Sequence, residues 1–298
     1  MGAILYLSKV GYGGWTTFCA HLHLTTGWPI YKLSKRCETR QRSFGYGCSY
    51  TNISKLPKAP IVVAAVGKHF YSQLETLPVG TVIVIHDPTE LRSQIVREQL
   101  NRFRVIVIRE SMLRHVPGAE YLPHPFYSYP TEKSDAPYKA VSISRIDYDK
   151  HTDIILAANA NGAQIDVWGF ANRQYVFFKL KEMSFEKYYK GGFKKTFEAL
   201  GEALKDARVV VDMSQIKHDG GGSQYSFLEA IHHGCALILH RNWVEFPNSI
   251  WKDGVNCTAV STPEELVDAV NRPNLPLATN LLLPHLQTNW SHHLFPLP

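Results

Sequence analysis

Cysteine is scarce in this chain, charged residues are few and no apolar run is long, and each of these absences excludes a class of protein. The five cysteines are odd in number and contain no C-x-x-C pair, so neither a disulfide framework nor a zinc finger is expected. No stretch approaches the roughly 20 apolar residues that cross a bilayer, so no transmembrane segment is expected. Reduced thiols and a cytoplasmic location are the resulting expectation.

A signal peptide and a metal centre are not expected either. Residues 1–10 read as a short strand, because a basic first region and a small-residue cleavage site are lacking. The fourteen histidines include the pairs His21/His23 and His232/His233, but neither pair has a carboxylate or thiolate at ligand spacing. We interpret them as core or surface residues and expect no metal or cofactor requirement.

The chain does contain enough apolar sequence for a substantial core. Its 298 residues are 45% hydrophobic and 19% charged, which suits a folded protein of two domains rather than a disordered one. The formal net charge of +6 indicates an anionic partner.

Apolar strands alternate with helical or turn sequence along the chain. Continuous β-branched runs of this kind are typical of parallel sheets that are covered on both faces. In the first half, strands are expected over 2–8, 61–66, 81–85 and 105–108. A second series begins at residue 140. The pattern predicts an α/β protein.

The expected architecture is two Rossmann-like, doubly wound domains facing a cleft. The Pro- and Ser-rich stretch 123–137 is the best linker candidate and divides an acceptor-side domain, 1–135, from a nucleotide-sugar-binding domain, 136–277. The C-terminal segment, 278–298, is expected to pack back on the first domain, with a helix over 280–290.

A glycine-rich loop that runs into a helix is the most informative motif. Residues 219–235 read DGGGSQYSFLEAIHHGC. Gly222 lets the backbone approach a charged ligand, and the amides near Tyr225 and Ser226 would open the helix toward phosphate. Glu229, about one turn further, could accept hydrogen bonds from a ribose. The alternative is a surface loop before an ordinary core helix.

A pair of cations follows an earlier strand. In the sequence SRIDYDK, Arg145 and Lys150 lie five positions apart at the carboxyl end of the strand that begins near residue 140. Arginine can clamp two oxygens while lysine supplies a mobile point charge, and together they suit a diphosphate. The alternative is a solvated loop.

His86 and Asp87 directly follow the strand 81–85, and Pro88 stiffens the turn. Asp87 could act as a base or electrostatic partner for an attacking hydroxyl, and His86 could donate a hydrogen bond to the donor or the acceptor. The alternative is that Asp87 caps a helix over 90–101.

The order of these motifs resembles the nucleotide-binding half of the retaining GT-B glycosyltransferases. Arg145 and Lys150 resemble that family's pyrophosphate pair, and the segment SFLEA at 226–230 resembles the end of its Glu-x7-Glu motif, followed by the turn WKDGVN at 251–256. The first Glu of the motif would fall on Gly221, so the carboxylate that grips the donor sugar is missing. The resemblance implies a UDP-sugar donor and retention of configuration.

The first half is similar to the GT-B enzymes that glucosylate hydroxymethylated DNA in T-even bacteriophages. The shared features are a glycine loop, here Gly13-Gly14, that runs into Thr16-Thr17-Phe18, and a strand that ends in His-Asp. This resemblance implies that Gly13 and Gly14 belong to the nucleotide-sugar site, that the acceptor is a 5-hydroxymethylated pyrimidine in phage DNA, and that the location is the cytoplasm of an infected host. The base would leave the duplex stack to react.

Two basic clusters carry aromatic neighbours. The predicted nucleic-acid contacts lie in a loop-like stretch that runs into Phe44, Tyr46 and Tyr50, and they are Lys32, Lys35, Arg36, Arg40 and Arg42. The second cluster, 177–195, fits a nucleic-acid surface and an amphipathic helix equally well.

Two other functions remain open. The enzyme could instead glycosylate a lipid-linked or surface polysaccharide, because basic and aromatic patches also suit anionic membranes. Alternatively, the chain could be a non-catalytic nucleotide-sugar-binding protein that lost turnover together with the first Glu of the motif.

Overall fold

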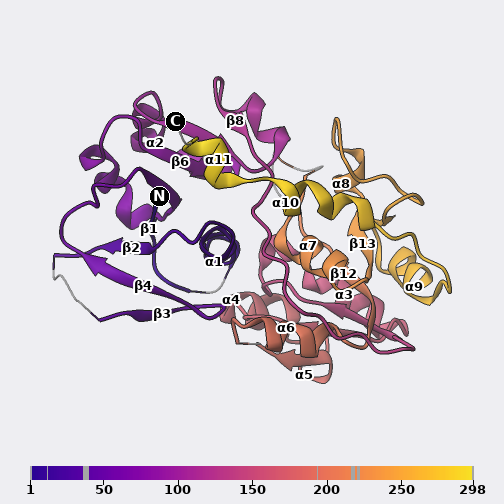
Figure 1. The fold of residues 1–298 in the computed structure, drawn as a ribbon. Coiled ribbons are helices and arrows are strands. Elements are labelled where there is room, and N and C mark those ends of the chain that lie inside the picture. The colour runs from indigo at the N-terminus through magenta and orange to yellow at the C-terminus, as the bar shows by residue number, and fades with distance from the viewer. Residues whose placement is uncertain are drawn as a thin grey trace. The chain divides into compact units, whose positions relative to one another are not determined.

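A computed structural model describes residues 2–11, 13–35, 40–192, 194–215, 219 and 222–296. The chain forms two compact units (Figure 1). Unit 1 comprises Met1–Tyr127 and Pro284–Pro298, and unit 2 comprises Ser128–Leu283. The boundaries expected from the sequence were residues 135 and 277.

Unit 1 is built on an eight-stranded sheet with the order β3-β4-β2-β1-β5-β6-β7-β8. Neighbouring strands are parallel except for the antiparallel pair β3–β4. The strands are β1 (Ala3–Leu7), β2 (Ile30–Leu33), β3 (Arg42–Gly45), β4 (Cys48–Ile53), β5 (Ile61–Val66), β6 (Val82–Ile85), β7 (Arg104–Val107) and β8 (Glu120–Tyr121).

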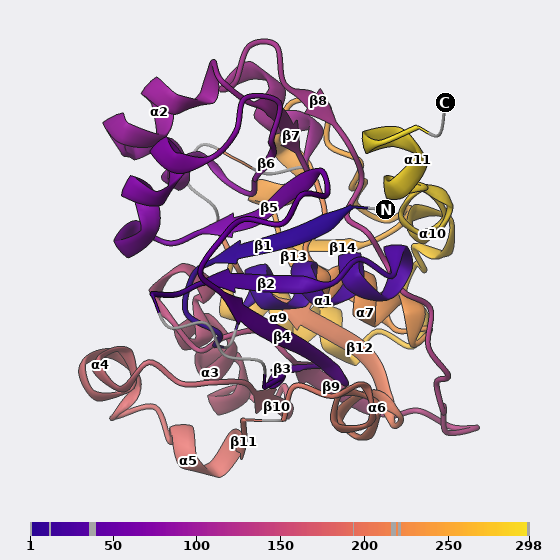
Figure 2. The ribbon, with the colours of Figure 1, turned by 60° about the vertical axis from the view of Figure 1, so that its left-hand side comes forward.

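The strand order of unit 1 reverses between β1 and β5. From β1 the chain adds β2 and β4 on one side and β5, β6 and β7 on the other, which is the Rossmann order (Figure 2). β1, β5 and β6 are buried along their whole length because they are almost entirely apolar. In sheets of this kind ligands bind at the carboxyl edge, where the order reverses.

Short helices surround the sheet of unit 1. They are α1 (Gly14–Thr26), α2 (Gln94–Leu100), α10 (Leu283–Gln287), α11 (Trp290–Leu294) and the 3₁₀ segments η1 (Lys68–Thr76), η2 (Pro88–Arg92) and η3 (Glu110–Arg114). The C-terminal segment is held by Trp290, whose ring lies 5.5 Å from that of Phe18 and whose Nε1 donates to the carbonyl of Pro123 at 3.0 Å.

Unit 2 has a six-stranded, wholly parallel sheet with the order β11-β10-β9-β12-β13-β14. Its order reverses between β9 and β12, so the second sheet repeats the Rossmann arrangement of the first. The strands are β9 (Lys139–Ser142), β10 (Ile165–Trp168), β11 (Tyr189–Gly191), β12 (Ala207–Asp212), β13 (Ala236–His240) and β14 (Thr258–Val260).

The helical elements of unit 2 are short. The first of them ends at Lys150, the second residue of the predicted cation pair. They are η4 (Tyr148–Lys150), α3 (Thr152–Ala160), α4 (Arg173–Tyr175), the π-helical η5 (Val176–Leu180), α5 (Phe185–Tyr188), α6 (Phe197–Leu204), α7 (Tyr225–His232), α8 (Asn242–Glu245), α9 (Pro263–Asn271) and η6 (Thr279–Leu282). Among the described residues, no helix is long and apolar enough to cross a bilayer.

Three expectations about local structure were wrong. The helix expected over 90–101 is divided into η2 and α2, because Ser93 interrupts it and caps α2. The helix expected over 280–290 is divided in the same way into η6, α10 and α11. The stretch from Lys32 to Tyr50 is not a loop, since its described parts contribute to β2, β3 and β4.

The turn of the β3–β4 hairpin explains why that hairpin was missed. Tyr46 and Gly47 both have positive φ, 54° and 72°, which is the type I′ geometry that fits the twist of paired strands. Asn-Gly or Asp-Gly is the dipeptide that usually indicates this turn in a sequence, and Tyr-Gly is not.

Candidate functional site

Lys150 occupies the carboxyl edge of the second sheet where the strand order reverses. Its side chain is buried, and Nζ donates to Oε1 of Gln224 at 2.9 Å. The amide of Gln224 in turn donates to Oγ of Ser214 at 2.8 Å. These bonds join the loop after β9, the loop after β12 and the residue that precedes α7.

Arg145 lies beside Lys150, as the sequence predicted for a diphosphate pair. The guanidinium contacts the carboxylate of Asp147 at 3.0 Å and that of Asp149 at 3.4 Å. Lys150 Nζ lies 3.9 Å from Asp149 as well, so one carboxylate bridges the two cations. Arg145 is exposed, whereas Lys150 is buried and held by Gln224, so the lysine is not the mobile point charge that the sequence suggested.

Gly169 makes room for the Arg145 loop. It follows β10 with a φ of 146°, a conformation that favours glycine. A Cβ atom at this position would overlap the carbonyl oxygen of Ser144. The glycine therefore lets the loops after β9 and β10 approach each other.

Tyr225 and Ser226 form the first turn of α7. Ser226 Oγ donates to Asp212 at 2.7 Å, and the same carboxylate accepts from the amide of Ser214 at 2.9 Å. Gly222 lies nearby in sequence, and its carbonyl accepts from Trp251 Nε1 at 2.6 Å. Gly221, where the family's first Glu would fall, lies outside the described residues. The helix start points its amide dipole toward the edge that carries Lys150.

Glu229 is a buried residue of α7 rather than a solvated one. The hydroxyl of Tyr129 donates to Glu229 Oε2 and lies 3.2 Å from His233 Nε2. Burial lowers the pKa of His233 to about 4, so this ring is neutral. The ring of Tyr129 stacks on Phe197 at a centroid distance of 4.0 Å. Sequence reasoning missed Tyr129, because nothing near it in the chain signals a partner.

Asp87 caps η2 in unit 1. Its Oδ1 accepts from the backbone amide of Thr89 at 2.8 Å and from the Thr89 hydroxyl. The cap predicted as the alternative role is therefore present, on η2 instead of the longer helix expected from the sequence. Only Oδ1 takes part in these bonds. The capping role therefore does not test the predicted role of the Asp87 carboxylate in the reaction, which stays a prediction.

His86 is buried and neutral. Its Nε2 lies 2.7 Å from the carbonyl of Ala64, which can only accept, so Nε2 carries the hydrogen. Burial lowers the pKa of His86 to about 4. The ring also meets Phe18 edge to face at 4.8 Å. In this state Nδ1 can accept a hydrogen bond, whereas the sequence suggested that His86 would donate one.

Gly13 and Gly14 open α1 after β1. Gly13 caps the helix with a φ of 131°, and its carbonyl accepts from the amides of Thr16 and Thr17 at 3.1 and 3.3 Å. The predicted glycine loop is thus a helix start at the carboxyl edge of the first sheet, at the point where its strand order reverses.

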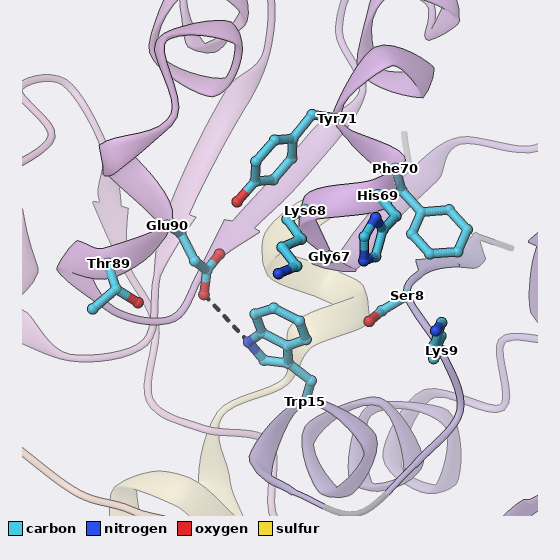
Figure 3. A pocket seen from close by; sticks show the side chains of 10 residues that line it. All are labelled: Ser8, Lys9, Trp15, Gly67, Lys68, His69, Phe70, Tyr71, Thr89 and Glu90. Carbon is cyan, nitrogen blue, oxygen red and sulfur yellow. Dashed lines mark hydrogen bonds between the residues drawn. The ribbon is translucent and has the colours of Figure 1, made fainter. Parts of the chain in front are cut away.

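A pocket of about 300 Å³ lies at this edge of unit 1 (Figure 3). The ends of β1 and β5, the start of α1 and segments η1 and η2 line it. Its lining includes Ser8, Trp15, Lys68, Phe70, Tyr71 and Glu90. The position agrees with the rule that ligands bind where a doubly wound sheet reverses its order.

Glu90 is the functional candidate that the sequence analysis missed. It is buried, and Oε1 accepts from the amide of His86 at 3.1 Å and from Trp15 Nε1 at 3.3 Å. Burial raises the pKa of Glu90 well above its ordinary value, and the charge of Asp87 adds to the rise. This environment favours the neutral carboxylic acid.

The predicted nucleic-acid residues do not form one exposed group. Lys32 donates to the carbonyl of Ser8, lies over the rings of Tyr6, Tyr50 and Phe70, and has a pKa lowered by burial. Its ammonium is therefore satisfied inside unit 1. The residues Lys35, Arg40 and Arg42 are exposed, and Arg36 lies outside the described residues.

The described residues of the second basic cluster contribute to η5, α5 and β11 rather than to one amphipathic helix. Phe185 and Tyr188 are buried, as an amphipathic helix would have them, whereas Phe177 and Phe178 are 61% and 70% exposed. Lys181 Nζ lies 5.6 Å from the ring of Phe177. The described part of the chain holds no cluster of three or more histidine, cysteine, aspartate or glutamate residues suited to a metal ion.

Neither a known sequence family nor a curated protein matches this chain. Solved structures match over most of its length. An α-glucosyltransferase in complex with UDP and a DNA 13-mer containing an HMU base is 12% identical, with a TM-score of 0.68 over 99% of this chain and 97% of that one. HepE from Anabaena, in complex with UDP and glucose, is 13% identical, with a TM-score of 0.65 over 91% and 89%.

Sucrose-phosphate synthase from Thermosynechococcus elongatus is a third match, 14% identical, with a TM-score of 0.59 over 91% of this chain and 89% of that one. At such identities the likeness concerns the fold. The chain has the GT-B fold. The predicted pair of Rossmann-like domains is confirmed, and so is the structural resemblance to the phage α-glucosyltransferase.

Proposed function

We propose that this GT-B protein is a glycosyltransferase that uses a UDP-sugar. The observation that carries the proposal is the placement of Arg145, Lys150 and the start of α7 at the reversal point of the second sheet. HepE and the α-glucosyltransferase share its fold and were solved in complex with UDP. These complexes support a UDP-sugar as the donor.

Arg145 and Lys150 would hold the diphosphate. Asp149 now bridges these cations, so a diphosphate that binds Arg145 would compete with this carboxylate. The amides near Tyr225 and Ser226 would add the positive end of the helix dipole. Glu229 would accept hydrogen bonds from the ribose, for which the bond from Tyr129 fixes its carboxylate.

The transfer would exchange one bond at the anomeric carbon for another. The acceptor oxygen bonds to this carbon while the bond from carbon to the β-phosphate oxygen breaks. The hydroxyl proton passes to Asp87 or to the departing phosphate. Cations and the helix dipole would stabilise the UDP that leaves, so that the reaction needs no metal. From the family resemblance we infer that the anomeric configuration is retained.

A 5-hydroxymethylated pyrimidine in DNA is the proposed acceptor. The α-glucosyltransferase match was solved with DNA that carries an HMU base, which supports this choice. Exposed Lys35, Arg40 and Arg42 supply cations for a phosphate backbone. The exposed pair Phe177–Phe178 with Lys181 favours the second candidate, a lipid-linked or polysaccharide acceptor, because such a patch suits an anionic membrane.

Mass spectrometry of nucleosides tests the proposal. Hydroxymethylated and plain DNA would each be incubated with a panel of UDP-sugars. We expect one sugar mass to be added to the hydroxymethylated base alone, with loss of this product in Lys150→Ala and its retention in Lys55→Ala, an exposed lysine outside both basic clusters. Transfer to a lipid-linked acceptor but not to DNA would favour the second candidate. Absence of transfer to any acceptor would contradict the enzyme.

A further inference from the structure

We propose that the pocket of unit 1 binds the ring of the acceptor, a single pyrimidine nucleotide, and that Glu90 reads it by donating a hydrogen bond from Oε2 to an acceptor atom of the ring. This rests on the proposed function, because the nucleotide would be the one that receives the sugar. The inference adds a recognition residue that the reaction itself does not require.

The hydrogen bonds of Glu90 determine which oxygen faces the ligand. Both bonds that it accepts, from the amide of His86 and from Trp15 Nε1, end on Oε1. A carboxyl oxygen has two lone pairs, so Oε1 is fully used as an acceptor and the proton of the neutral acid belongs on Oε2. In Figure 3 the carboxyl group of Glu90 turns toward the space above Trp15.

The neighbours of Glu90 reinforce its neutral form. Burial is the main cause of its raised pKa, and the nearby charge of Asp87 acts in the same direction, while the bonds to Oε1 and the charge of Arg109 oppose it. The titratable groups from the elements around it are Asp87 and His86 after β6, Arg109 after β7, and Lys68 and Tyr71 on η1. His86 is neutral and adds no charge, and the Asp87 carboxylate is the anion that contributes to the raised pKa of Glu90.

The size and lining of the pocket favour a nucleotide over a glycan chain. A volume of about 300 Å³ is at the lower limit of the roughly 300–1,000 Å³ of small-molecule sites, so it holds one substituted ring. Trp15 and Phe70 offer aromatic faces for stacking. Exposed Lys9 and Lys68 offer cations for the phosphate that accompanies each ring in a nucleic acid.

Polar groups converge on the same space. Figure 3 shows the ammonium of Lys68 and the hydroxyl of Tyr71 on the side of the pocket that carries Glu90. Gly67 lets the ends of β1 and β5 approach each other closely, because a Cβ atom there would lie 2.8 Å from Oγ of Ser8. An alanine at this position would displace the Ser8 side chain, which also lines the pocket.

Glutamine at position 90 provides a sharp test. Its amide imitates the neutral acid: Oε1 still accepts from Trp15 and His86, and Nε2 donates to the ligand at every pH. Calorimetry with 5-hydroxymethyl-dCMP would be done at saturating UDP, so that the donor site is occupied, and across a range of pH. Glu98→Gln, an exposed glutamate on α2, is the matched control.

We expect wild-type affinity for the mononucleotide to fall as pH rises through the raised pKa of Glu90, and Glu90→Gln to bind at all pH values. Glu90→Ala should weaken binding about tenfold without changing UDP affinity. A wild-type pH profile in Glu90→Gln, or equal losses in the Gln and Ala variants, would overturn the proposal. The pH dependence of mononucleotide binding in Glu90→Gln tests the proposal even if Glu90→Ala does not fold.

Failure of the pocket and failure of the enzyme give different results. Mononucleotide binding without transfer from any UDP-sugar would overturn the proposed function and keep the pocket. Transfer to DNA without mononucleotide binding would overturn the pocket and keep the function. Binding of a free hexose but not of the nucleotide would also overturn the inference and favour a glycan acceptor.

Discussion

Glu229 accepts a hydrogen bond from the hydroxyl of Tyr129, a residue 100 positions away in the chain. The pair is buried within unit 2, and Nε2 of the neutral His233 ring lies 3.2 Å from the same hydroxyl. The carboxylate therefore has a fixed orientation before any nucleotide arrives, which lowers the cost of ordering it on binding.

This relationship predicts different effects for two substitutions. Glu229→Ala should weaken nucleoside binding by about 1.5–3 kcal/mol, the range for hydrogen bonds to charged groups, and Glu229→Gln should weaken it less, because the amide can still accept one bond. Calorimetry with UDP measures both. Equal and negligible effects would mean that Glu229 serves only the core of unit 2.

Asp87 should show whether a capping residue also takes part in the reaction. Asn caps a helix about as well as Asp but cannot accept a proton, so Asp87→Asn should keep the fold and UDP affinity. We expect turnover to fall about a hundredfold or more, the usual contribution of a positioned acid or base. Near-normal turnover would limit Asp87 to its cap on η2 and leave His86 as the next candidate.

The exposed cations predict a salt-dependent affinity for DNA. Log affinity should fall with log salt concentration, and neutralising Lys35 and Arg40 together with Arg36 should make the slope shallower. Lys32→Ala is the contrast, since its ammonium is bound inside unit 1 and its loss should lower stability more than the slope. Equal slopes in wild type and the triple variant, or tighter binding to liposomes than to duplex, would favour the lipid acceptor.

Buried histidines predict instability in acid. Burial lowers the pKa of His86, His233 and His285 to about 4, below the ordinary value of 6.5. At these histidines the unfolded chain binds more protons in this window, so their contribution to the unfolding free energy should be complete above pH 6.5 and fall as the pH drops toward 4.

His285→Gln should reduce this loss by up to about 3 kcal/mol, since a tenfold difference in proton affinity between the folded and unfolded chain corresponds to about 1.4 kcal/mol. Exposed His292→Gln is the control. Denaturant unfolding at a series of pH values measures the effect, and a variant whose pH dependence equals that of wild type would contradict the assignment.

The sequence was most informative where local pattern decides the structure. The unbroken apolar runs of β1, β5 and β6 identify strands of a buried parallel sheet without any knowledge of neighbours. The closeness of Arg145 and Lys150 could be predicted from the sequence, because both residues follow the same strand and remain at its carboxyl end.

Residues defined by distant contacts could not be foreseen. Glu90 resembles an ordinary acidic residue in the first turn of a helix, but it is buried and shares its Oε1 with Trp15, 75 positions away in the chain. Lys32 resembled a surface cation, yet the arrangement of β1, β2 and β4 surrounds it with aromatic rings.

Titration of UDP into the protein and its Arg145→Ala variant tests the central claim most directly. If Arg145 and Lys150 hold the diphosphate, UDP should bind wild type, and Arg145→Ala should lose about 1.5–3 kcal/mol of binding free energy. Arg173→Ala, an exposed arginine of the same unit, should bind as wild type does. Unchanged UDP affinity in a folded Arg145→Ala protein would contradict the account.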